Sequence, residues 1–207
     1  MIERAFRWQQ FEDPSWLKFL FGNRIMAPVF LLARLYVGWQ FLQAGYEKIT
    51  GTGWINHDGS ALQGFWTRIV AVPQTGTAPI KYGWYRDFIQ FMLDHDWYTW
   101  FAYVIAFGEA CVGIALIVGC FTGLAAIFGA TLNFNFLLAG SASTNPVLFL
   151  LAILLLLGWK VSGYIGVDRW LLPALGTPWQ RGRLFKRDEA QGTGARPNRP
   201  ATAVHNN

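Results

Sequence analysis

The amino-acid sequence predicts an all-α integral membrane protein, a four-helix up-down bundle, and two observations carry this prediction. Hydrophobic residues make up 53% of the 207 residues and charged residues only 14%, against roughly 25% charged residues in soluble domains. The apolar residues also gather into long runs instead of amphipathic stripes. Because lipid offers no partners for backbone N–H and C=O groups, such runs cross the bilayer as helices.

Four segments have the length and apolar character of a membrane span, which needs about 20 residues. We predict spans over about 26–46, 98–118, 122–140 and 146–164. Together they form a membrane domain over 26–172. The connections at 119–121 and 141–145 are uncharged and allow only tight hairpins, so consecutive helices are antiparallel.

The connection of roughly 50 residues between the first two spans is predicted to be a helical loop. Residues 61–72 and 84–95 place apolar side chains at helical spacing, and the segment PQTGTAP between them is rich in turn residues. Tryptophans favour the membrane–water interface. The loop carries four of them: Trp54, Trp66, Trp84 and Trp97. We therefore expect it to lie on the outer membrane face.

Basic residues set the predicted orientation. The segment 1–25 contains Arg4, Arg7, Lys18 and Arg24, and seven further basic residues follow the fourth span: Arg169, Arg181, Arg183, Lys186, Arg187, Arg196 and Arg199. The positive-inside rule predicts that both termini lie in the cytoplasm and the long loop outside. We expect the membrane to be the plasma (inner) membrane of a prokaryote. The tail 173–207 is expected to be largely disordered. The net charge of +5 follows from this topology and from lipid headgroups, and needs no nucleic-acid partner.

Two charged residues lie deep inside predicted spans, whereas Lys160 lies within about 6 Å of the end of the fourth span and can snorkel. Arg34 and Glu109 each lie about 12–13 Å from the cytoplasmic end of their span, at 1.5 Å per residue. A charge within the bilayer costs at least ~2.5–3.5 kcal/mol and needs a partner. We therefore expect Arg34 and Glu109 to form an ion pair, and take them as candidate catalytic residues. Two interpretations stay open, because such a pair can receive a proton or polar headgroup, or can only fix the helix register.

Three polar residues are candidates for binding a substrate or a quinone. Gln43 and Lys48 lie at the outer end of the first span, where Lys48 can also serve as a snorkelling anchor. Asn133 shares a helix face with Gly129 and can join the same polar cluster. His57 and His95 lack ligand spacing, so we expect no metal site. The sequence contains no CxxC pair, haem attachment motif or nucleotide loop.

Short motifs resemble the DoxX/DoxD-like family of membrane proteins. The first span has Arg34 and Gly38 followed by QAGYEK, and the second has GEACVGIALIVGCFTGLAA. The fourth span ends in GYIGVDRWL. The resemblance covers all four spans, roughly residues 26–172.

The resemblance implies a redox role. DoxD-type members are subunits of a thiosulfate:quinone oxidoreductase, which passes electrons from thiosulfate to quinone. We therefore expect a subunit of a quinone-linked oxidoreductase, with quinone as a possible cofactor, no bound metal or haem, and a second redox subunit or a second copy as partner in the lipid bilayer. The alternative is a non-catalytic membrane partner that organises a redox or stress-response complex.

Overall fold

The computed structural model describes residues 14–177 and 180–183. The chain forms two compact units, residues 1–168 and 169–207. The helices of the first unit are α1 (Ser15–Gly22), η1 (Arg24–Met26), α2 (Ala27–Thr50), α3 (Ser60–Val70), α4 (Gly83–Asp94), α5 (Tyr98–Val118), α6 (Thr122–Leu138), α7 (Asn145–Leu157) and α8 (Trp159–Ser162). Helix α9 (Asp168–Leu175) leads into the second unit, where β1 (Gly176–Thr177) and β2 (Gln180–Arg181) form an antiparallel pair.

The helix boundaries follow the predicted spans closely in α5 and less closely elsewhere. Helix α2 runs four residues past the predicted end of the first span, and α6 ends two residues early. The fourth predicted span, 146–164, consists of two helices, because the chain breaks at Gly158. A Cβ at Gly158 would lie 2.5 Å from the Phe30 ring, so only glycine lets α2 approach this break.

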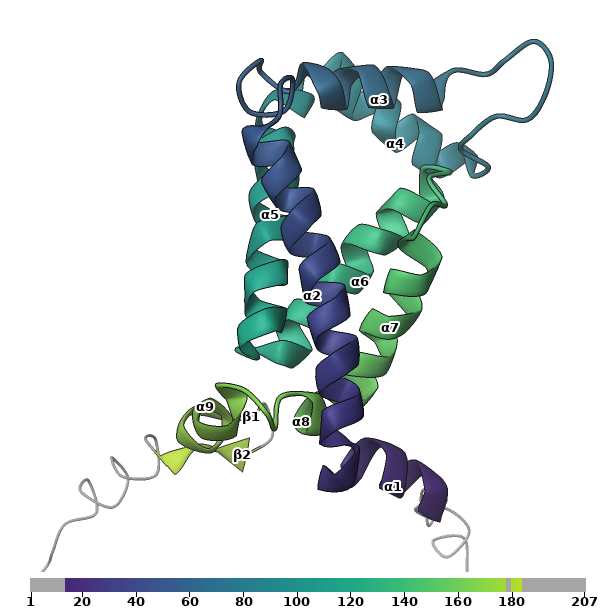
Figure 1. The fold of residues 1–207 in the computed structure, drawn as a ribbon. Helices are drawn as coiled ribbons and strands as arrows, with labels where there is room; N and C mark the ends of the chain where they lie inside the picture. Colours follow the sequence, from purple (N-terminus) through teal and green to yellow (C-terminus); the bar gives the residue numbers. More distant parts are fainter. Residues whose placement is uncertain (1–13, 178–179, 184–207) are drawn as a thin grey trace, which may run out of the picture. The chain divides into compact units, whose positions relative to one another are not determined.

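The helices of the first unit pack as two main pairs. Helix α2 lies mainly against α5, and α6 mainly against α7, as Figure 1 shows for the purple, teal and green ribbons. Glycines bring α2 and α5 together: a Cβ on Gly113 would lie 2.5 Å from the Leu42 nitrogen, and one on Gly45 2.5 Å from the Ala110 nitrogen. Small residues at helix contacts are the usual means of close packing in membranes.

Two apolar clusters hold the first unit together. One joins α2, α5, α6, α7 and α8 through residues such as Phe41, Leu116 and Leu155. The other joins α3 and α4 to the beginning of α5 and the end of α6, through residues such as Trp66 and Met92. Helices α3 and α4 occupy the two stretches with helical spacing and lie across one end of the α2–α5 pair (Figure 1).

Among the residues that the structure describes, two helices are long and apolar enough to cross a membrane. They extend over Arg24–Thr50 and Tyr98–Val118, and the shorter helices Thr122–Leu138 and Asn145–Leu157 are also apolar. The outward faces of α5 and α6 are apolar as well, with Phe107 and Phe128 about half exposed. Aromatic side chains on an outer helix face suit contact with lipid.

Candidate functional site

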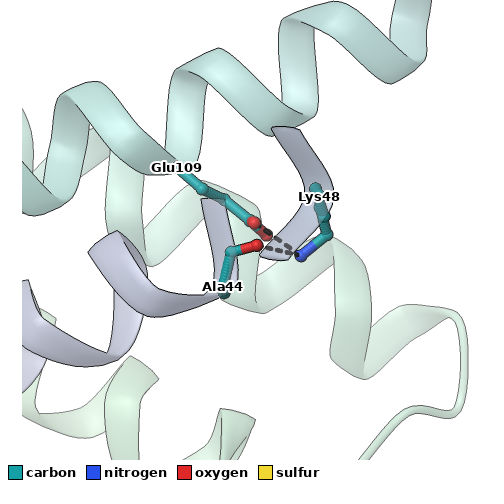
Figure 2. Close-up of polar contacts among 3 residues, drawn as sticks. All are labelled: Ala44, Lys48 and Glu109. Carbon is teal, nitrogen blue, oxygen red and sulfur yellow. Dashed lines mark hydrogen bonds and ion pairs between the residues drawn. The ribbon is translucent and has the colours of Figure 1, made fainter. Parts of the chain in front are cut away.

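An ion pair joins the end of α2 to the middle of α5. The Lys48 ammonium lies 2.5 Å from the Glu109 carboxylate and 3.5 Å from the Ala44 carbonyl (Figure 2). The Glu109 side chain is 2% exposed and that of Lys48 16%. The charge of Glu109 is thus removed from solvent and balanced by one cation that keeps limited access to solvent.

The aromatic rings around Lys48 complete its surroundings. Its Nζ atom lies 5.1 Å from the centre of the Trp54 ring and 5.9 Å from that of Phe136. Ring faces attract a cation, more strongly where water is scarce. The ammonium is therefore held by one carboxylate and two rings, which together fix its position without enclosing it.

The ion pair lines a cavity of about 250 Å³. Helices α2, α5 and α6 form its walls, and the turn between α6 and α7 forms its rim. Its lining residues are Gln40, Phe41, Ala44, Lys48, Glu109, Asn133, Phe136, Ser141, Ser143, Thr144, Asn145 and Leu148. The volume lies below the roughly 300–1,000 Å³ of most small-molecule pockets, so the cavity suits a small solute or the head group of a larger molecule.

Asn133 presents an unused hydrogen-bond donor in this cavity. Its side chain is 2% exposed, and its Nδ2 atom has no hydrogen-bond partner among the described residues. Leaving such a donor without a partner costs about 1–3 kcal/mol. A ligand that accepts a hydrogen bond there would recover part of this cost. The structure thus brings together Lys48, Glu109 and Asn133, three of the five predicted site residues.

Gln43 lies outside the cavity. Its Nε2 atom donates a hydrogen bond of 3.0 Å to Glu47 on an exposed face of α2. The neighbouring Gln40 lines the cavity instead. Gln40, Ala44 and Lys48 are spaced four residues apart and share one face of α2. A helical wheel centred on Lys48 would therefore have identified Gln40, not Gln43, as a site residue.

The predicted ion pair between Arg34 and Glu109 is wrong. Arg34 is 1% exposed, but its guanidinium donates to the carbonyl oxygens of Ser162, at 2.7 Å, and Ile165, at 2.6 Å. Asp168 is the acidic group that acts on it electrostatically. Arg34 therefore holds the backbone where the chain leaves α8, and it contacts neither Glu109 nor the cavity.

The register of α2 against α5 explains this error. Arg34 lies against Gly119, just past the end of α5, whereas Glu109 lies beside the contact between Gly45 and Ala110. Arg34 and Gly45 are eleven residues apart, or about 16 Å along the helix axis. The depths of Arg34 and Glu109 were each counted from the end of their own span, which assumes that the two helices end at the same level. Helix α2 instead extends about two turns beyond the level at which α5 ends.

Asp168 has a different role from the one its sequence position suggests. It follows the fourth predicted span in the sequence. Its carboxylate instead accepts hydrogen bonds of 2.7 Å from the backbone N–H groups of Phe121 and Thr122, at the beginning of α6. A carboxylate at a helix N-terminus satisfies free N–H groups and complements the helix dipole. Asp168 of the motif GYIGVDRWL thus caps the beginning of α6.

The turn 141–145 was missed as part of the site. Its sequence SASTN indicates only a tight hairpin, yet its Ser141, Ser143 and Asn145 line the cavity. Ser143 has a φ of +36°, and the Asn145 amide donates a 2.7 Å hydrogen bond to the Ser141 carbonyl. A non-glycine residue with positive φ is strained and recurs at functional sites.

Metal ligands do not gather at this site. Within residues 14–177 and 180–183, no group of three or more His, Cys, Asp or Glu side chains is placed to hold a metal ion. Cys111 and Cys120 are free thiols on and just after α5. The contact that the structure shows for the Glu109 carboxylate is its ion pair with Lys48.

Comparison with known proteins identifies the family. The family model DoxX matches residues 29–141, which is more than half of the chain and includes every residue of the Lys48–Glu109–Asn133 cluster. Neither the curated proteins nor the solved structures gave a match. Two helices long and apolar enough to span a bilayer agree with the membrane character of the family. The chain is therefore an integral membrane protein that belongs to the DoxX family.

Proposed function

We propose that this protein is the membrane subunit of a quinone-linked oxidoreductase, built on four membrane-spanning segments. Helices α2, α5, α6 and the α7–α8 pair form these segments, with both termini in the cytoplasm. Helices α3 and α4 then lie on the outer face. Charge supports this orientation, because the segments 1–25 and 173–207 are rich in Arg and Lys, as cytoplasmic segments are.

The observation that carries the proposal is the Lys48–Glu109 ion pair in the wall of the cavity. A buried pair that only fixes helix register needs no cavity, and a charge within a membrane usually marks a pathway or site. Here the pair lines about 250 Å³ of space next to the unpartnered Asn133 amide. In the proposed topology this cavity opens towards the outer face.

The donors in the cavity suit a quinone head group. Quinone oxygens accept hydrogen bonds, which the Lys48 ammonium and the Asn133 amide can donate. Since Glu109 already balances the charge of Lys48, a neutral head group enters without an uncompensated charge. We infer that Lys48, Glu109 and Asn133 bind the acceptor, while Arg34 stabilises the inner end.

In the proposed reaction a second subunit oxidises thiosulfate, and the electrons pass to the quinone bound by this chain. Two thiosulfate ions joining into one tetrathionate ion release two electrons. One quinone takes up those two electrons and two protons to become a quinol. Lys48, which keeps access to solvent, is placed to pass protons to the quinone oxygen, and Glu109 keeps Lys48 in position.

A turnover assay tests the proposal. The protein, purified in mild detergent with its partner, should reduce a short-chain quinone when thiosulfate is added, as followed by quinone absorbance. We expect Lys48→Met and Glu109→Gln to lower kcat/KM by roughly 100-fold, the scale of losing a positioned electrostatic group. Gln43→Ala, outside the cavity on the same helix, should keep full activity.

Two outcomes would contradict the proposal. If both cavity variants keep wild-type turnover while folding normally, the cavity is not the quinone site. If the protein copurifies with an oxidoreductase that reduces quinone equally well without it, the alternative function applies. In that case the protein is a non-catalytic membrane partner that organises the complex.

A further inference from the structure

The segment after Asp168 gathers positive charge. Its described residues, 169–177 and 180–183, contain three arginines and no acidic residue: Arg169, Arg181 and Arg183. These residues belong to the second compact unit of the chain. This short segment folds back on itself. The fold therefore determines which arginines lie close to one another.

The β1–β2 hairpin returns the chain to helix α9. Gly176 pairs with Arg181 across the two strands, and the Gly182 N–H donates to the Leu175 carbonyl at 3.2 Å. A Cβ at Gly182 would collide with the Ala174 carbonyl, so glycine permits this close return. Arg183 is thereby placed beside the helix that carries Arg169.

Both arginines line one recess. Arg169 and Arg183 surround a cavity of about 450 Å³ together with Trp170, Pro173 and Ala174. The Arg169 guanidinium lies 6.0 Å from the centre of the Trp170 ring, and Trp170 is 70% exposed. The recess is thus lined by two arginine residues, an exposed tryptophan and two apolar residues.

The beginning of this segment is fixed at the end of the helix group. The Asp168 N–H donates to the Gly119 carbonyl at 2.8 Å, and the Asp168 carboxylate binds the first N–H groups of α6. Arg169 follows by one peptide bond. In the proposed topology, the end of α5 and the beginning of α6 mark the cytoplasmic boundary of the membrane.

We propose that this recess binds the phosphate group of an anionic phospholipid of the cytoplasmic leaflet. Guanidinium groups form paired hydrogen bonds with phosphate oxygens. Exposed tryptophan rings favour the level of the headgroups, and basic residues next to a membrane span attract anionic lipids. The proposal rests on the membrane topology proposed above and is independent of the redox role.

Retention of lipid tests the proposal. The full-length protein is placed in nanodiscs of equal parts phosphatidylglycerol and phosphatidylcholine, released, and examined by native mass spectrometry. We expect the wild type to keep phosphatidylglycerol selectively. The variant Arg169→Ala/Arg183→Ala should keep it roughly 30-fold less, since each basic residue contributes about fivefold.

Matched variants distinguish binding at this recess from a nonspecific effect of the protein's positive charge. Arg68→Ala/Lys81→Ala removes the same charge from exposed positions in the connection between α2 and α5 and should retain phosphatidylglycerol like the wild type. Arg169→Lys/Arg183→Lys should recover part of the binding, because charge remains while the paired geometry is lost. Circular dichroism confirms that each variant is folded.

Three results would overturn the proposal. The first is equal retention of phosphatidylglycerol by the wild type and the Arg169→Ala/Arg183→Ala variant. The second is an equal loss in the Arg68→Ala/Lys81→Ala control. The third is complete displacement of the lipid by millimolar inorganic phosphate, which would identify a soluble phosphate site. Quinone reduction is not measured here, so failure of the redox proposal leaves this result unaffected.

Discussion

Asn133 carries a donor that the folded chain leaves unused, in a cavity lined by a buried ion pair. Replacing one partner of a hydrogen bond usually destabilises a protein, but within the described part of the chain the Asn133 Nδ2 donor has no partner to lose. Replacing Asn133 therefore tests ligand binding with less effect on stability than replacing Lys48 or Glu109. Removing either charged residue leaves the other charge without its partner.

The variant Asn133→Leu is therefore expected to fold at least as stably as the wild type while binding quinone about tenfold more weakly. The loss corresponds to one hydrogen bond to the ligand, of about 1–1.5 kcal/mol. Thermal unfolding and equilibrium binding of a short-chain quinone, both measured in detergent, check the two parts. A large drop in unfolding temperature would show that the amide has a structural partner.

Tyr85 connects α4 to α6. Its side chain is 4% exposed, and its hydroxyl donates a 3.1 Å hydrogen bond to the Asn135 carbonyl. Burial raises the pKa of Tyr85 to about 12, against about 10 for a tyrosine in water. The folded state thus favours the neutral phenol, and ionisation above pH 10 weakens the fold.

This pKa predicts a pH-dependent stability. The stabilisation is fully present below pH 10 and is lost as the pH rises from 10 to 12, by about 3 kcal/mol for two pKa units. Denaturant unfolding of the wild type and Tyr85→Phe over this range checks it, because only the wild type should lose this contribution. Tyr82→Phe, which removes an exposed tyrosine of the same segment, should follow the wild type.

At the scale of elements, the contact between α2 and α5 decides where the functional side chains lie. The two helices approach through glycines, and this approach sets Lys48, not Arg34, next to Glu109. A one-turn shift of α2 along α5 would move Lys48 by about 5.4 Å and separate the pair. Helix packing is thus part of the site.

Two glycines of α5 provide a matched test of this contact. A Cβ at Gly113 would lie 2.5 Å from the backbone of Leu42, whereas one at Gly108 would meet nothing within 4 Å. We expect Gly113→Ala to destabilise the protein by about 1–3 kcal/mol through overpacking. Gly108→Ala should be neutral or stabilising, by up to about 1 kcal/mol, through helix propensity. Similar unfolding midpoints for both variants would contradict this account of the packing.

At the scale of the molecule, the proposed topology places loop 71–82 outside the cell and the C-terminal tail inside. We expect a membrane-impermeant maleimide to label Thr75→Cys in intact cells, and Ala195→Cys only after permeabilisation, in a background where Cys111 and Cys120 are alanine. The charge distribution along the chain is the reason. Labelling of both positions in intact cells would place the two segments on the same side.

Predictability differed between the helices and the site for a physical reason. Apolar runs and turn residues are local signals, so the boundaries of α5 were predictable to the residue and those of α3 and α4 nearly so. Lys48 and Asn133 were identifiable because polar side chains near or within membrane helices are energetically costly and usually mark a site. Which of them meet depends on how far one helix is displaced along another.

The sequence by itself determined the membrane class, the helical segments and the family, because hydrophobic length, charge distribution and short motifs are properties of the chain. Tertiary structure alone decided that Glu109 binds Lys48, that Arg34 holds the carbonyls of Ser162 and Ile165, and that the turn 141–145 borders the cavity. The difference arises because glycine contacts fix the register of α2 against α5 to within ångströms, whereas a pattern of apolar residues tolerates a shift of about three turns.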